Sequence, residues 1–572
     1  MAGSSVIVST RRRPRRRSRR RRLLTRALPV LALAAAAFLA GFAIADRPGH
    51  EEHALVAHYV RDWAAGDVGA MYRLLDPRSR ATVSEGAFAR RLAAAARTAT
   101  LRSLRVNRVG SVQGSSIAVS MTADTRLWGA LHETLVVPLH GSGSSARVHL
   151  DSQLLFPGLR PGERLHNRLS LPVRGTLLAD DGTPLAQGPD RGSPIPSVAD
   201  EVVGTLGPIP PAMRAEYAAQ GYPRRAQVGQ DGLELVFQKL LAGRIGGKLL
   251  AGRRVLASVS PAQAPPVRTT IDPTLELAAV AAEAGRYAGI AVLDPRTGAV
   301  EALSGIAYSA LQPPGSTMKI ITASAALQAG VVKLTTVFPY ATSATIDGFT
   351  LHNANGEDCG GTLLEAFAVS CNSVFAPLGV TIGGSRLVAM AERFGFDSPA
   401  SIPGAAESVI PNPIGSAVAV GSSAIGQGLV QTTPLEMADV AATIAMGGRR
   451  PIPTLLAGQP PRFVRVTSAK VAREVQKMMI AVVQYGTGTA AQISGVQVAG
   501  KTGTAEIHNS VPNPKHPNQA DNPKNTDAWF VGYAPVGHPR VVAGALFPAQ
   551  GFGAGTAAPA VHDVIVAALE HH

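Results

Sequence analysis

The spacing of apolar residues predicts a small α+β unit over residues 46–155. Helical spacing comes first, on the face formed by Leu55, Val56, Tyr59, Val60 and Trp63. A second helical pattern carries Phe88 and Leu92. Strand-like alternation follows at residues 117–121, 135–139 and 148–150. Helices followed by strands suggest a sheet that cradles the helices. The sequence shows no catalytic cluster here, so we expect a spacer or docking role.

The regular pattern weakens over residues 156–268, which are rich in Gly, Pro and Arg. Pro208-Ile209-Pro210-Pro211 interrupts regular structure. One short amphipathic helix is expected from Gly232 to about Gly243. We therefore expect this stretch to be an extended connecting module.

From Thr269 onward the pattern predicts one larger domain, residues 269–572. Ala288–Asp294 and Ala299–Leu303 predict a hairpin across the turn sequence Pro295-Arg296-Thr297-Gly298. A mostly helical middle is expected from Ser316 to about Met446. Later elements are strands at Val496–Ile507, Trp529–Tyr533 and Val541–Phe547 and a helix from about Ala558 to Leu569. Strands at both ends with helices between them imply one antiparallel sheet flanked by helices, an α+β layered domain.

The N-terminus combines a basic block with an apolar run. The net charge is +16, but residues 1–26 hold eleven arginines and no acid, which leaves 44 basic against 39 acidic residues, or +5, elsewhere. The run Ala27–Ala45 is 19 uncharged residues, which at 1.5 Å rise nearly spans a bilayer core of about 30 Å. Because cations before such a span stay in the cytoplasm, we expect a single-pass membrane anchor with the remaining chain outside the cytoplasm.

This segment has two alternative interpretations. A cleaved signal peptide is the main alternative, because Ala43-Ile44-Ala45 resembles a small-residue cleavage site. The run is longer than the usual signal-peptide core of about 7–15 residues. Nucleic-acid binding by the arginines is disfavoured, because no aromatic residue is interleaved with them and their position before an apolar span already explains them.

Ser316 and Lys319 lie at the start of an apolar helix. Pro313-Pro314-Gly315 precedes them, and an alanine-rich run continues to Ala329 before Gly330 ends it. Lys319 is one helical turn along the same face as Ser316. A serine hydroxyl is a weak nucleophile until a base takes its proton, and a lysine is such a base only when burial or another cation lowers its pKa. Alone, Ser-x-x-Lys is weak, because a helix-start serine and a solvated lysine give the same pattern.

A second polar cluster is Ser370-Cys371-Asn372, at the end of a short helix. Thr362 and Glu365 form a capping box that starts this helix. The hydroxyl and the amide of the triplet suit proton relay and the binding of a substrate amide. Taken alone, an ordinary turn at a helix terminus is the simpler interpretation.

The third cluster is Lys501-Thr502-Gly503-Thr504, inside an alternating strand. A glycine within a strand usually marks a place where another group approaches the backbone. A lysine beside two threonines suits a carboxylate ligand. Taken alone, a surface strand with a bulge explains the pattern equally simply.

The order of the three clusters makes the pattern specific. Ser-x-x-Lys, Ser-x-Asn and Lys-Thr-Gly follow one another, with 54 residues from Ser316 to Ser370 and 129 from Asn372 to Lys501. This is the signature of penicillin-binding proteins and serine β-lactamases. Further matching pieces are Thr270-Ile271-Asp272, Pro314-Gly315-Ser316-Thr317, Gly426-Gln427-Gly428, Thr432-Thr433-Pro434 and Asp527–Tyr533. Residues 269–572 therefore resemble the transpeptidase domain of class B penicillin-binding proteins.

The resemblance extends upstream more weakly. Arg174-Gly175, Asp181-Gly182 and Leu185-Ala186 resemble the dimerisation and linker module of that class, and residues 46–155 resemble the NTF2-like domain of the MecA type. The resemblance implies a multidomain α+β chain. Its parts are a cytoplasmic Arg-rich tail (1–26), a transmembrane anchor (27–45), an NTF2-like domain (46–155), a linker module (156–268) and a transpeptidase domain (269–572). No segment of this sequence is left for a glycosyltransferase domain.

The resemblance also implies an acyl-enzyme mechanism. Ser316, with Lys319 as its base, attacks the penultimate carbonyl of a D-Ala-D-Ala stem peptide, and Ser370 helps pass the proton to the departing D-alanine. Asn372 binds a substrate amide. The substrate's terminal carboxylate is held in the segment made by Lys501, Thr502, Gly503 and Thr504. Backbone N–H groups of Ser316 and Thr504 form the oxyanion hole. The amine of a neighbouring stem then attacks the acyl-enzyme, and a β-lactam imitates the donor and blocks Ser316.

The implied partners are stem peptides and lipid-linked glycan, β-lactams, the membrane and a glycosyltransferase of the wall-synthesis machinery. No nucleic acid, metal or organic cofactor is expected. The alternatives are a β-lactamase or D,D-carboxypeptidase, and a β-lactam-binding sensor or scaffold. A class D β-lactamase prefers an apolar residue where Asn372 stands, and antibiotic hydrolysis needs no upstream region of roughly 300 residues. A sensor needs an output domain, which the Arg-rich tail does not supply.

The chain has two cysteines, Cys359 and Cys371. They bracket the short helix that precedes Asn372. An even count in an exported chain permits a disulfide, which we predict here. Closing such a loop contributes about 3 kcal/mol and fixes Asn372. Two packed thiols are the alternative.

Overall fold

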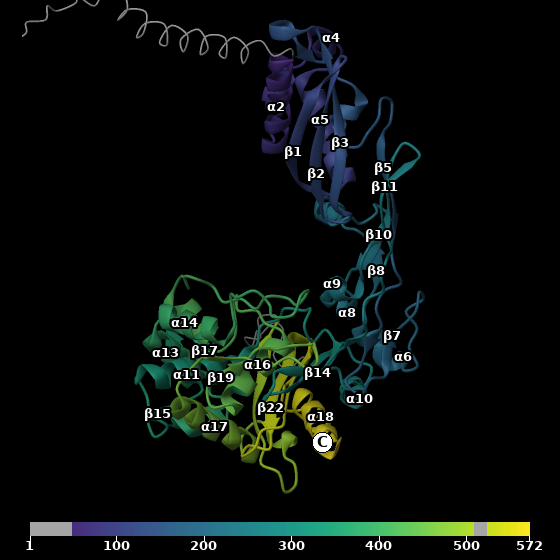
Figure 1. Ribbon diagram of the computed structural model, residues 1–572. Helices are drawn as coiled ribbons and strands as arrows, with labels where there is room; N and C mark the ends of the chain where they lie inside the picture. Colours follow the sequence, from purple (N-terminus) through teal and green to yellow (C-terminus); the bar gives the residue numbers. More distant parts are fainter. Residues whose placement is uncertain (1–48, 508–522, 572) are drawn as a thin grey trace, which may run out of the picture. The chain divides into compact units, whose positions relative to one another are not determined.

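The computed structural model describes residues 49–507 and 523–571 (Figure 1). These residues divide into two compact units. The first contains the described residues up to 170, with 214–223 and 246–260; the second contains 171–213, 224–245 and the chain from 261 onward. The predicted Arg-rich tail (1–26) and membrane anchor (27–45) lie outside the described residues.

No single helix among the described residues is long and apolar enough to cross a membrane. One pair of consecutive helices, Asn372–Ile382 and Gly384–Phe394, passes that test by length and composition alone, with a bend of 100° between them.

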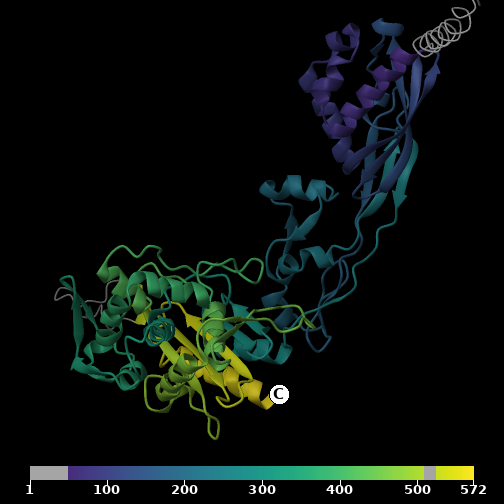
Figure 2. The ribbon, with the colours of Figure 1, turned by 60° about the vertical axis from the view of Figure 1, so that its left-hand side comes forward.

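The first unit packs four helices against a four-stranded antiparallel sheet of order β1-β2-β3-β4 (Figure 2). The helices are α2 (His50–Ala65), α3 (Val68–Arg73), α4 (Pro77–Thr82) and α5 (Glu85–Thr98). The strands are β1 (Leu101–Gln113), β2 (Ser116–Thr125), β3 (Gly129–His140) and β4 (Arg147–Val148). Asp67, Asp76 and Ser84 cap α3, α4 and α5 by accepting backbone N–H bonds. The predicted helical face is buried at Val56, Tyr59, Val60 and Trp63.

The long strand β1 was not predicted from the sequence. Its burial does not alternate cleanly, and three register shifts interrupt its pairing with β2. Arg102, Arg105 and Arg108 recur at intervals of three residues along it. The strand therefore lacks the period-two pattern on which sequence prediction depends.

Residues of the connecting region lie in both units. β5 (Leu165–Ser170), β10 (Gly246–Ala251) and β11 (Arg254–Val259) form an antiparallel sheet in the first unit. In the second unit, β6 (Leu177–Leu178), β7 (Pro184–Ala186) and β12 (Val267–Arg268) form a small sheet beside α6 (Pro196–Val202). The expected single helix after Gly232 is two short helices, α8 (Gly232–Val236) and α9 (Gln238–Leu241).

The C-terminal domain is built on a five-stranded antiparallel sheet of order β14-β13-β23-β22-β21. The strands are β13 (Gly289–Asp294), β14 (Ala299–Gly305), β21 (Ala499–Glu506), β22 (Thr526–Ala534) and β23 (Val541–Phe547). Helices α10 (Pro273–Glu283) and α18 (Ala557–His571) form one core with one face of this sheet. The other face packs against α16 (Pro434–Ala445) and the helical region. The predicted hairpin and sheet flanked by helices are confirmed.

The helical region contains α11 (Lys319–Ala329), α12 (Leu363–Ala368), α13 (Asn372–Ile382), α14 (Gly384–Phe394), α15 (Ala417–Ala424) and, later, α17 (Ala469–Gln484). The prediction of a mostly helical stretch is wrong for residues 337–362. There β15 (Val337–Ala341) pairs with β18 (Cys359–Thr362), and β16 (Ser343–Ile346) pairs with β17 (Phe349–His352). Asp347-Gly348 joins β16 to β17 with positive φ at both residues, the Asp-Gly hairpin turn that a sequence search can find.

Candidate active site

Ser316 lies in a tight 3₁₀ turn, η4 (Gly315–Met318), that leads directly into α11. Gly315 has φ +52°, and a Cβ atom at this position would lie 2.6 Å from the carbonyl oxygen of Thr504. Its N–H donates to the carbonyl oxygen of Gly426 at 2.9 Å. Because the residue has no side chain, the serine turn can lie against the backbone of strand β21.

Gly503 makes the matching approach from the strand. A Cβ atom there would lie 2.7 Å from the carbonyl oxygen of Pro314 and 2.8 Å from the Cβ atom of Trp529. The close backbone approach expected at this glycine therefore involves the segment that carries Ser316. The turn and the strand meet backbone to backbone, so Ser316 and Thr504 lie side by side.

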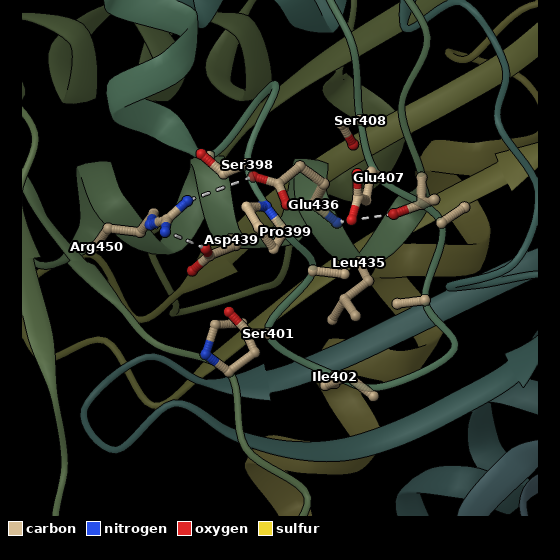
Figure 3. A pocket seen from close by; sticks show the side chains of 16 residues that line it. Ser398, Pro399, Ser401, Ile402, Glu407, Ser408, Leu435, Glu436, Asp439 and Arg450 are labelled. Carbon is tan, nitrogen blue, oxygen red and sulfur yellow. Dashed lines mark hydrogen bonds and ion pairs between the residues drawn. The ribbon is translucent and has the colours of Figure 1, made fainter. Parts of the chain in front are cut away.

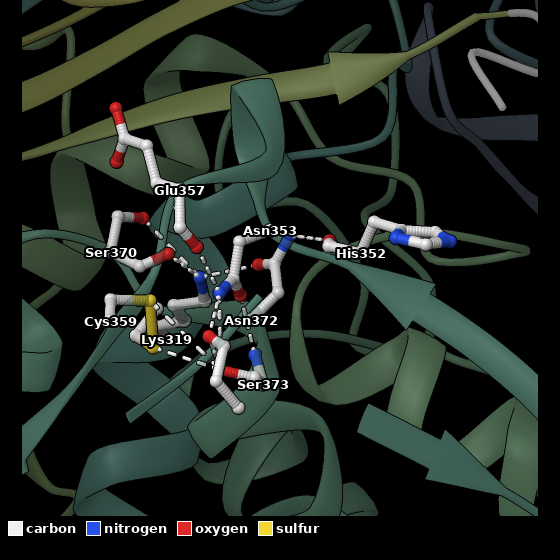
Figure 4. The surroundings of a disulfide bond; sticks show 10 residues. Lys319, His352, Asn353, Glu357, Cys359, Ser370, Asn372 and Ser373 are labelled. Atoms are coloured by element: carbon white, nitrogen blue, oxygen red, sulfur yellow. Dashed lines mark hydrogen bonds between the residues drawn. A yellow bond between two sulfur atoms is a disulfide. The ribbon is translucent and has the colours of Figure 1, made fainter. Parts of the chain in front are cut away.

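The side chains of Lys319 and Lys501, which are far apart in the sequence, both contact Ser370. Figure 4 shows the contact made by Lys319. The Nζ atom of Lys319 donates to the Ser370 carbonyl oxygen at 2.6 Å and to Asn372 Oδ1 at 2.7 Å, and lies 3.3 Å from Ser370 Oγ. The Nζ atom of Lys501 donates to Ser370 Oγ at 2.9 Å and to the Thr502 carbonyl oxygen at 3.0 Å. Folding thus gathers all three sequence motifs around one serine hydroxyl.

Both lysine side chains are fully buried. Burial, and then the nearby charge of Lys501, lower the pKa of Lys319 well below its usual range. Burial also lowers the pKa of Lys501 to about 7. A neutral Lys319 amine is a competent proton acceptor, which an exposed lysine at neutral pH is not.

Ser370 is held in an uncommon backbone conformation, with φ +64°. It follows α12, where its N–H donates to the Phe367 carbonyl oxygen and the Cys371 N–H donates to that of Ala366. A disulfide joins Cys371 to Cys359 on strand β18 (Figure 4). The turn between α12 and α13 is therefore fixed on both sides, and both oxygens of Ser370 face the lysines.

Asn372 is positioned by contacts at both ends of its amide. Its Oδ1 accepts from Lys319, and its Nδ2 donates to the His352 carbonyl oxygen at 3.0 Å. The neighbouring Asn353, which the sequence analysis missed, is buried and donates to the carbonyl oxygens of Ala341 and Glu357 (Figure 4). Asn353 thus ties the β15–β18 region to α13 below the site. A lone asparagine carries no pattern from which this role can be predicted.

Comparison with known proteins agrees with this geometry. Residues 288–566 match the family described as the penicillin-binding protein transpeptidase domain. The C-terminal part of this chain therefore has the fold of a penicillin-binding protein transpeptidase domain. Residues 182–253, upstream of the transpeptidase domain, match the penicillin-binding protein dimerisation domain.

The C-terminal domain is similar in sequence to known proteins. Over 288 residues the chain is 38% identical to the peptidoglycan D,D-transpeptidase PbpA of Mycolicibacterium smegmatis, a match that covers 46% of this chain and 56% of the relative. The chain thus spans just over half the length of the curated relatives it matches first.

Solved structures of penicillin-binding proteins are also similar to this chain. A crystal structure of PBPA from Mycobacterium tuberculosis has 28% identity and a TM-score of 0.56, and the match covers 69% of this chain and 99% of that one. A ceftriaxone acyl-enzyme complex of the same protein has 28% identity and a TM-score of 0.54, with coverage of 69% and 98%.

A second residue missed from the sequence lies beside the strand of the transpeptidase domain. The Thr487 hydroxyl is 2.5 Å from the Thr502 hydroxyl, and the Thr487 N–H donates to the Ala368 carbonyl oxygen at 3.1 Å. A Cβ atom at Gly486 would lie 2.1 Å from that same carbonyl oxygen. Thr487 therefore connects the Lys-Thr-Gly strand with the helix that precedes Ser370. The Gly-Thr-Gly-Thr sequence at 486–489 was the available signal.

The transpeptidase domain also contains a polar cavity of about 30 Å³ beside α16 and the loop after α14 (Figure 3). Arg450 lies 3.8 Å from Glu436 and 3.7 Å from Asp439. Burial raises the pKa of Glu436 to about 7 and that of Asp439 well above its usual value, against the opposing effect of Arg450. None of the three motifs lines this cavity, so it is separate from the candidate active site.

Proposed function

We propose that this chain is a peptidoglycan D,D-transpeptidase that works through an acyl-enzyme on Ser316. The observation that carries the proposal is the position of the Ser370 hydroxyl, 2.9 Å from Lys501 Nζ and 3.3 Å from Lys319 Nζ. An amine with a lowered pKa, a hydroxyl relay and a cation for a carboxylate are the three groups that acyl transfer from a D-Ala-D-Ala donor requires. The family match and the PbpA relatives support the same activity.

In the acylation step, neutral Lys319 takes the hydroxyl proton of Ser316, and Ser316 Oγ attacks the penultimate carbonyl carbon of the donor stem. The resulting oxyanion accepts hydrogen bonds from the backbone N–H groups of Ser316 and Thr504. Contacts at Gly315 and Gly503 support this pairing, because they hold the serine turn against the strand. Such preformed donors contribute about 3–4 kcal/mol each to the transition state.

Collapse of the intermediate breaks the bond to the terminal D-alanine, whose nitrogen takes a proton. Ser370 relays that proton from Lys319, since its hydroxyl lies within reach of both lysines. Lys501, Thr502 and Thr504 bind the terminal carboxylate along the strand that Gly503 keeps open, and Asn372 binds a substrate amide. The amine of a second stem then attacks the acyl carbon, gives its proton to Lys319, and restores the Ser316 hydroxyl.

The same groups accept a β-lactam in place of the donor stem, and ring opening leaves Ser316 acylated. Attack by water in place of the amine would make the chain a D,D-carboxypeptidase or a β-lactamase, the alternatives to transpeptidation. Retention of Lys319, Lys501 and a relay serine argues against a non-catalytic scaffold.

The other expected parts of the chain belong to this proposal. Residues 27–45 anchor the chain in the cell membrane, with the catalytic domain outside the cytoplasm. Residues 46–155 form an NTF2-like domain, 156–268 the linker module and 269–572 the transpeptidase domain. Helices cradled by a sheet in the first unit support the NTF2-like assignment. The partners expected for such a chain are lipid-linked glycan and a glycosyltransferase of the wall-synthesis machinery.

The test is to incubate the full-length chain with a fluorescent penicillin, map the labelled peptide and follow release of the label. We expect a stable adduct on Ser316, no adduct for Ser316→Ala, and normal labelling for Ser324→Ala, a buried serine on the same helix. Rapid release would indicate a β-lactamase. An adduct elsewhere, or none at all, would reject the proposal.

A further inference from the structure

An exposed aromatic surface lies next to the candidate active site. It consists of Tyr340 on β15, Glu365 on α12, Val369 just after α12, and Tyr485 at the end of α17; we call these four residues the tyrosine surface. Tyr340 is 66% exposed, Tyr485 56% and Val369 37%. Helix α12 packs against both β15 and α17, which brings the four residues onto neighbouring elements.

Glu365 lies between the two tyrosines. A Cβ atom at Gly361 would lie 2.7 Å from Glu365 Oε2 and 3.3 Å from the Tyr340 hydroxyl, so both side chains cover that glycine. On the other side, burial and then the charge of Glu365 raise the pKa of Tyr485. The Val369 N–H donates to the Glu365 carbonyl oxygen at 3.1 Å. The tyrosine surface is therefore continuous.

Two residues of the tyrosine surface lie next to residues of the candidate active site in the sequence. Val369 immediately precedes Ser370. Tyr485 is two residues before Thr487, whose hydroxyl is 2.5 Å from that of Thr502. Each residue of a chain spans at most about 3.6 Å, so the Cα atoms of Tyr485 and Thr487 are within about 7 Å of one another. Val369 and Tyr485 thus connect the tyrosine surface directly to residues of the candidate active site.

The chemistry of the surface suits a carbohydrate. Exposed aromatic patches mark binding surfaces, and a tyrosine ring offers an apolar face with a polar hydroxyl at its end, which matches the C–H faces and hydroxyl groups of a sugar ring. Hydrogen bonds from the Thr362 backbone N–H and hydroxyl lower the pKa of Glu365, which keeps it ionised. A carboxylate accepts hydrogen bonds from sugar hydroxyls and acetamido N–H groups.

A protein partner fits this surface less well. The centre of a protein interface is depleted of charged residues, and covering Glu365 without a cation would leave a desolvated charge. A sugar chain supplies donors to the carboxylate and leaves the rim hydrated.

We propose that the tyrosine surface binds the glycan chain of the peptidoglycan whose stem peptide reaches Ser316. The inference rests on the proposed function. Because each extended peptide residue adds at most about 3.6 Å, the sugar that carries a short stem stays within a few residues' length of Ser316.

The experiment measures binding of un-cross-linked, stem-bearing glycan chains to the full-length protein, and the rate of acylation by a fluorescent penicillin, which carries no sugar. We expect Tyr340→Ala and Tyr485→Ala each to weaken glycan binding about fivefold, and the double variant more than tenfold. Acylation should stay within twofold of the parent chain, and Tyr→Trp variants should retain binding. Tyr287→Ala is the matched control, since Tyr287 has the same exposed fraction as Tyr340, 66%.

The outcomes separate this inference from the proposed function. If the parent chain forms no adduct on Ser316, the proposed function fails. If it is acylated normally and the double variant binds glycan as tightly as the parent, the tyrosine surface is not the glycan site. An equal loss for Tyr287→Ala, or a lower melting temperature for the tyrosine variants alone, would also overturn the inference, because the loss would then not be local to the surface.

Discussion

A Cβ atom at Gly315 would stand 2.6 Å from the carbonyl oxygen of Thr504, so the residue before the candidate nucleophile has room only for hydrogen. Gly315→Ala should therefore push the serine turn away from β21. A shift of about 1 Å in a reacting group costs on the order of a hundredfold in rate. We expect the acylation rate by penicillin to fall by about that factor.

Gly330 is the matched control for this substitution. It has a similar backbone, φ +70°, but no atom lies within 4 Å of its Cβ position. Gly330→Ala should cost about 1 kcal/mol in the free energy of unfolding, because an L side chain disfavours this left-handed backbone, and should leave the acylation rate unchanged. Equal acylation losses for the two variants would mean that the contact with Thr504 is unimportant.

The second prediction concerns pH. Acylation needs neutral Lys319, whose pKa is lowered by burial and by Lys501. The acylation rate should therefore persist to pH values well below the usual pKa of a lysine. It also needs protonated Lys501, whose pKa is lowered by burial to about 7, so the rate should fall as the pH rises through about 7. The second-order acylation rate of the free enzyme between pH 5 and 9 reports both groups.

Lys501→Arg tests the assignment of the alkaline limb. A guanidinium stays protonated throughout this range, so the variant should lose the decline above pH 7, whatever its maximal rate. Lys333→Arg, at an exposed position, should keep the parent profile. A parent rate that still rises between pH 7 and 9 would contradict the role given to Lys501.

A third prediction concerns stability. Burial raises the pKa of Glu276 to about 8, although one oxygen accepts the Leu303 N–H at 2.7 Å. The folded state thus holds this proton more tightly than the unfolded state. The stabilisation that the bound proton gives the folded state is complete below the unfolded-state pKa of about 4.3, and it is lost as the pH rises towards 8. We expect the free energy of unfolding to fall by a few kcal/mol over this range.

Glu276→Gln keeps the acceptor and removes the titration. Denaturant unfolding of the variant should therefore show a shallower pH dependence, with its relative stability improving from pH 5 to pH 8. The exposed Glu570→Gln variant should follow the parent chain. A Glu276→Gln variant with the parent's slope would assign the pH dependence to other groups.

A fourth prediction concerns the disulfide Cys359–Cys371, whose cysteines are 12 residues apart. Cys359→Ser should lower stability by about 3 kcal/mol and slow acylation, because the turn that carries Ser370 loses an attachment to β18. Thermal melting and penicillin labelling measure the two effects. Mass spectrometry that finds two free thiols in protein purified without reductant would reject the bridge.

A fifth prediction concerns Thr487, which hydrogen-bonds the Thr502 hydroxyl at 2.5 Å. Thr487→Val keeps the shape but leaves Thr502 without this partner, which costs about 1 kcal/mol or more. We expect about a tenfold rise in KM for a stem-peptide donor with a smaller change in kcat. Thr487→Ser should restore the parent KM; if it does not, the hydroxyl is not the reason.

The sequence predicted the parts of the site whose chemistry is written in short motifs. Ser316, Lys319, Ser370, Asn372 and Lys501 were singled out by residue type and order. The structure joins the last four by hydrogen bonds and places Ser316 in the turn before Lys319. Asn353 was missed because no local pattern marks it, and Thr487 because its Gly-Thr-Gly-Thr segment does not reveal the contact with Thr502. Such contacts exist only once the chain has folded.

The helices and strands divide in the same way, into those with a clear local sequence pattern and those without one. The hairpin β13–β14 and the final helix carry clear periodicity and were predicted. Strand β1 was missed because bulges disrupt its alternation, and the pair β16–β17 because its Asp347-Gly348 turn was overlooked. The 3₁₀ form of the Ser316 turn could not be predicted locally, since contact with Thr504 and Gly426 determines it.

If the proposed function holds, the glycine contacts around Ser316 also limit how this chain can escape β-lactams by mutation. Gly315, Gly426 and Gly503 each face backbone atoms within 2.7 Å of a Cβ position. Any larger residue there would displace the serine turn that carries the proposed nucleophile. If the proposed function holds, drug-resistant forms should therefore leave these three positions untouched.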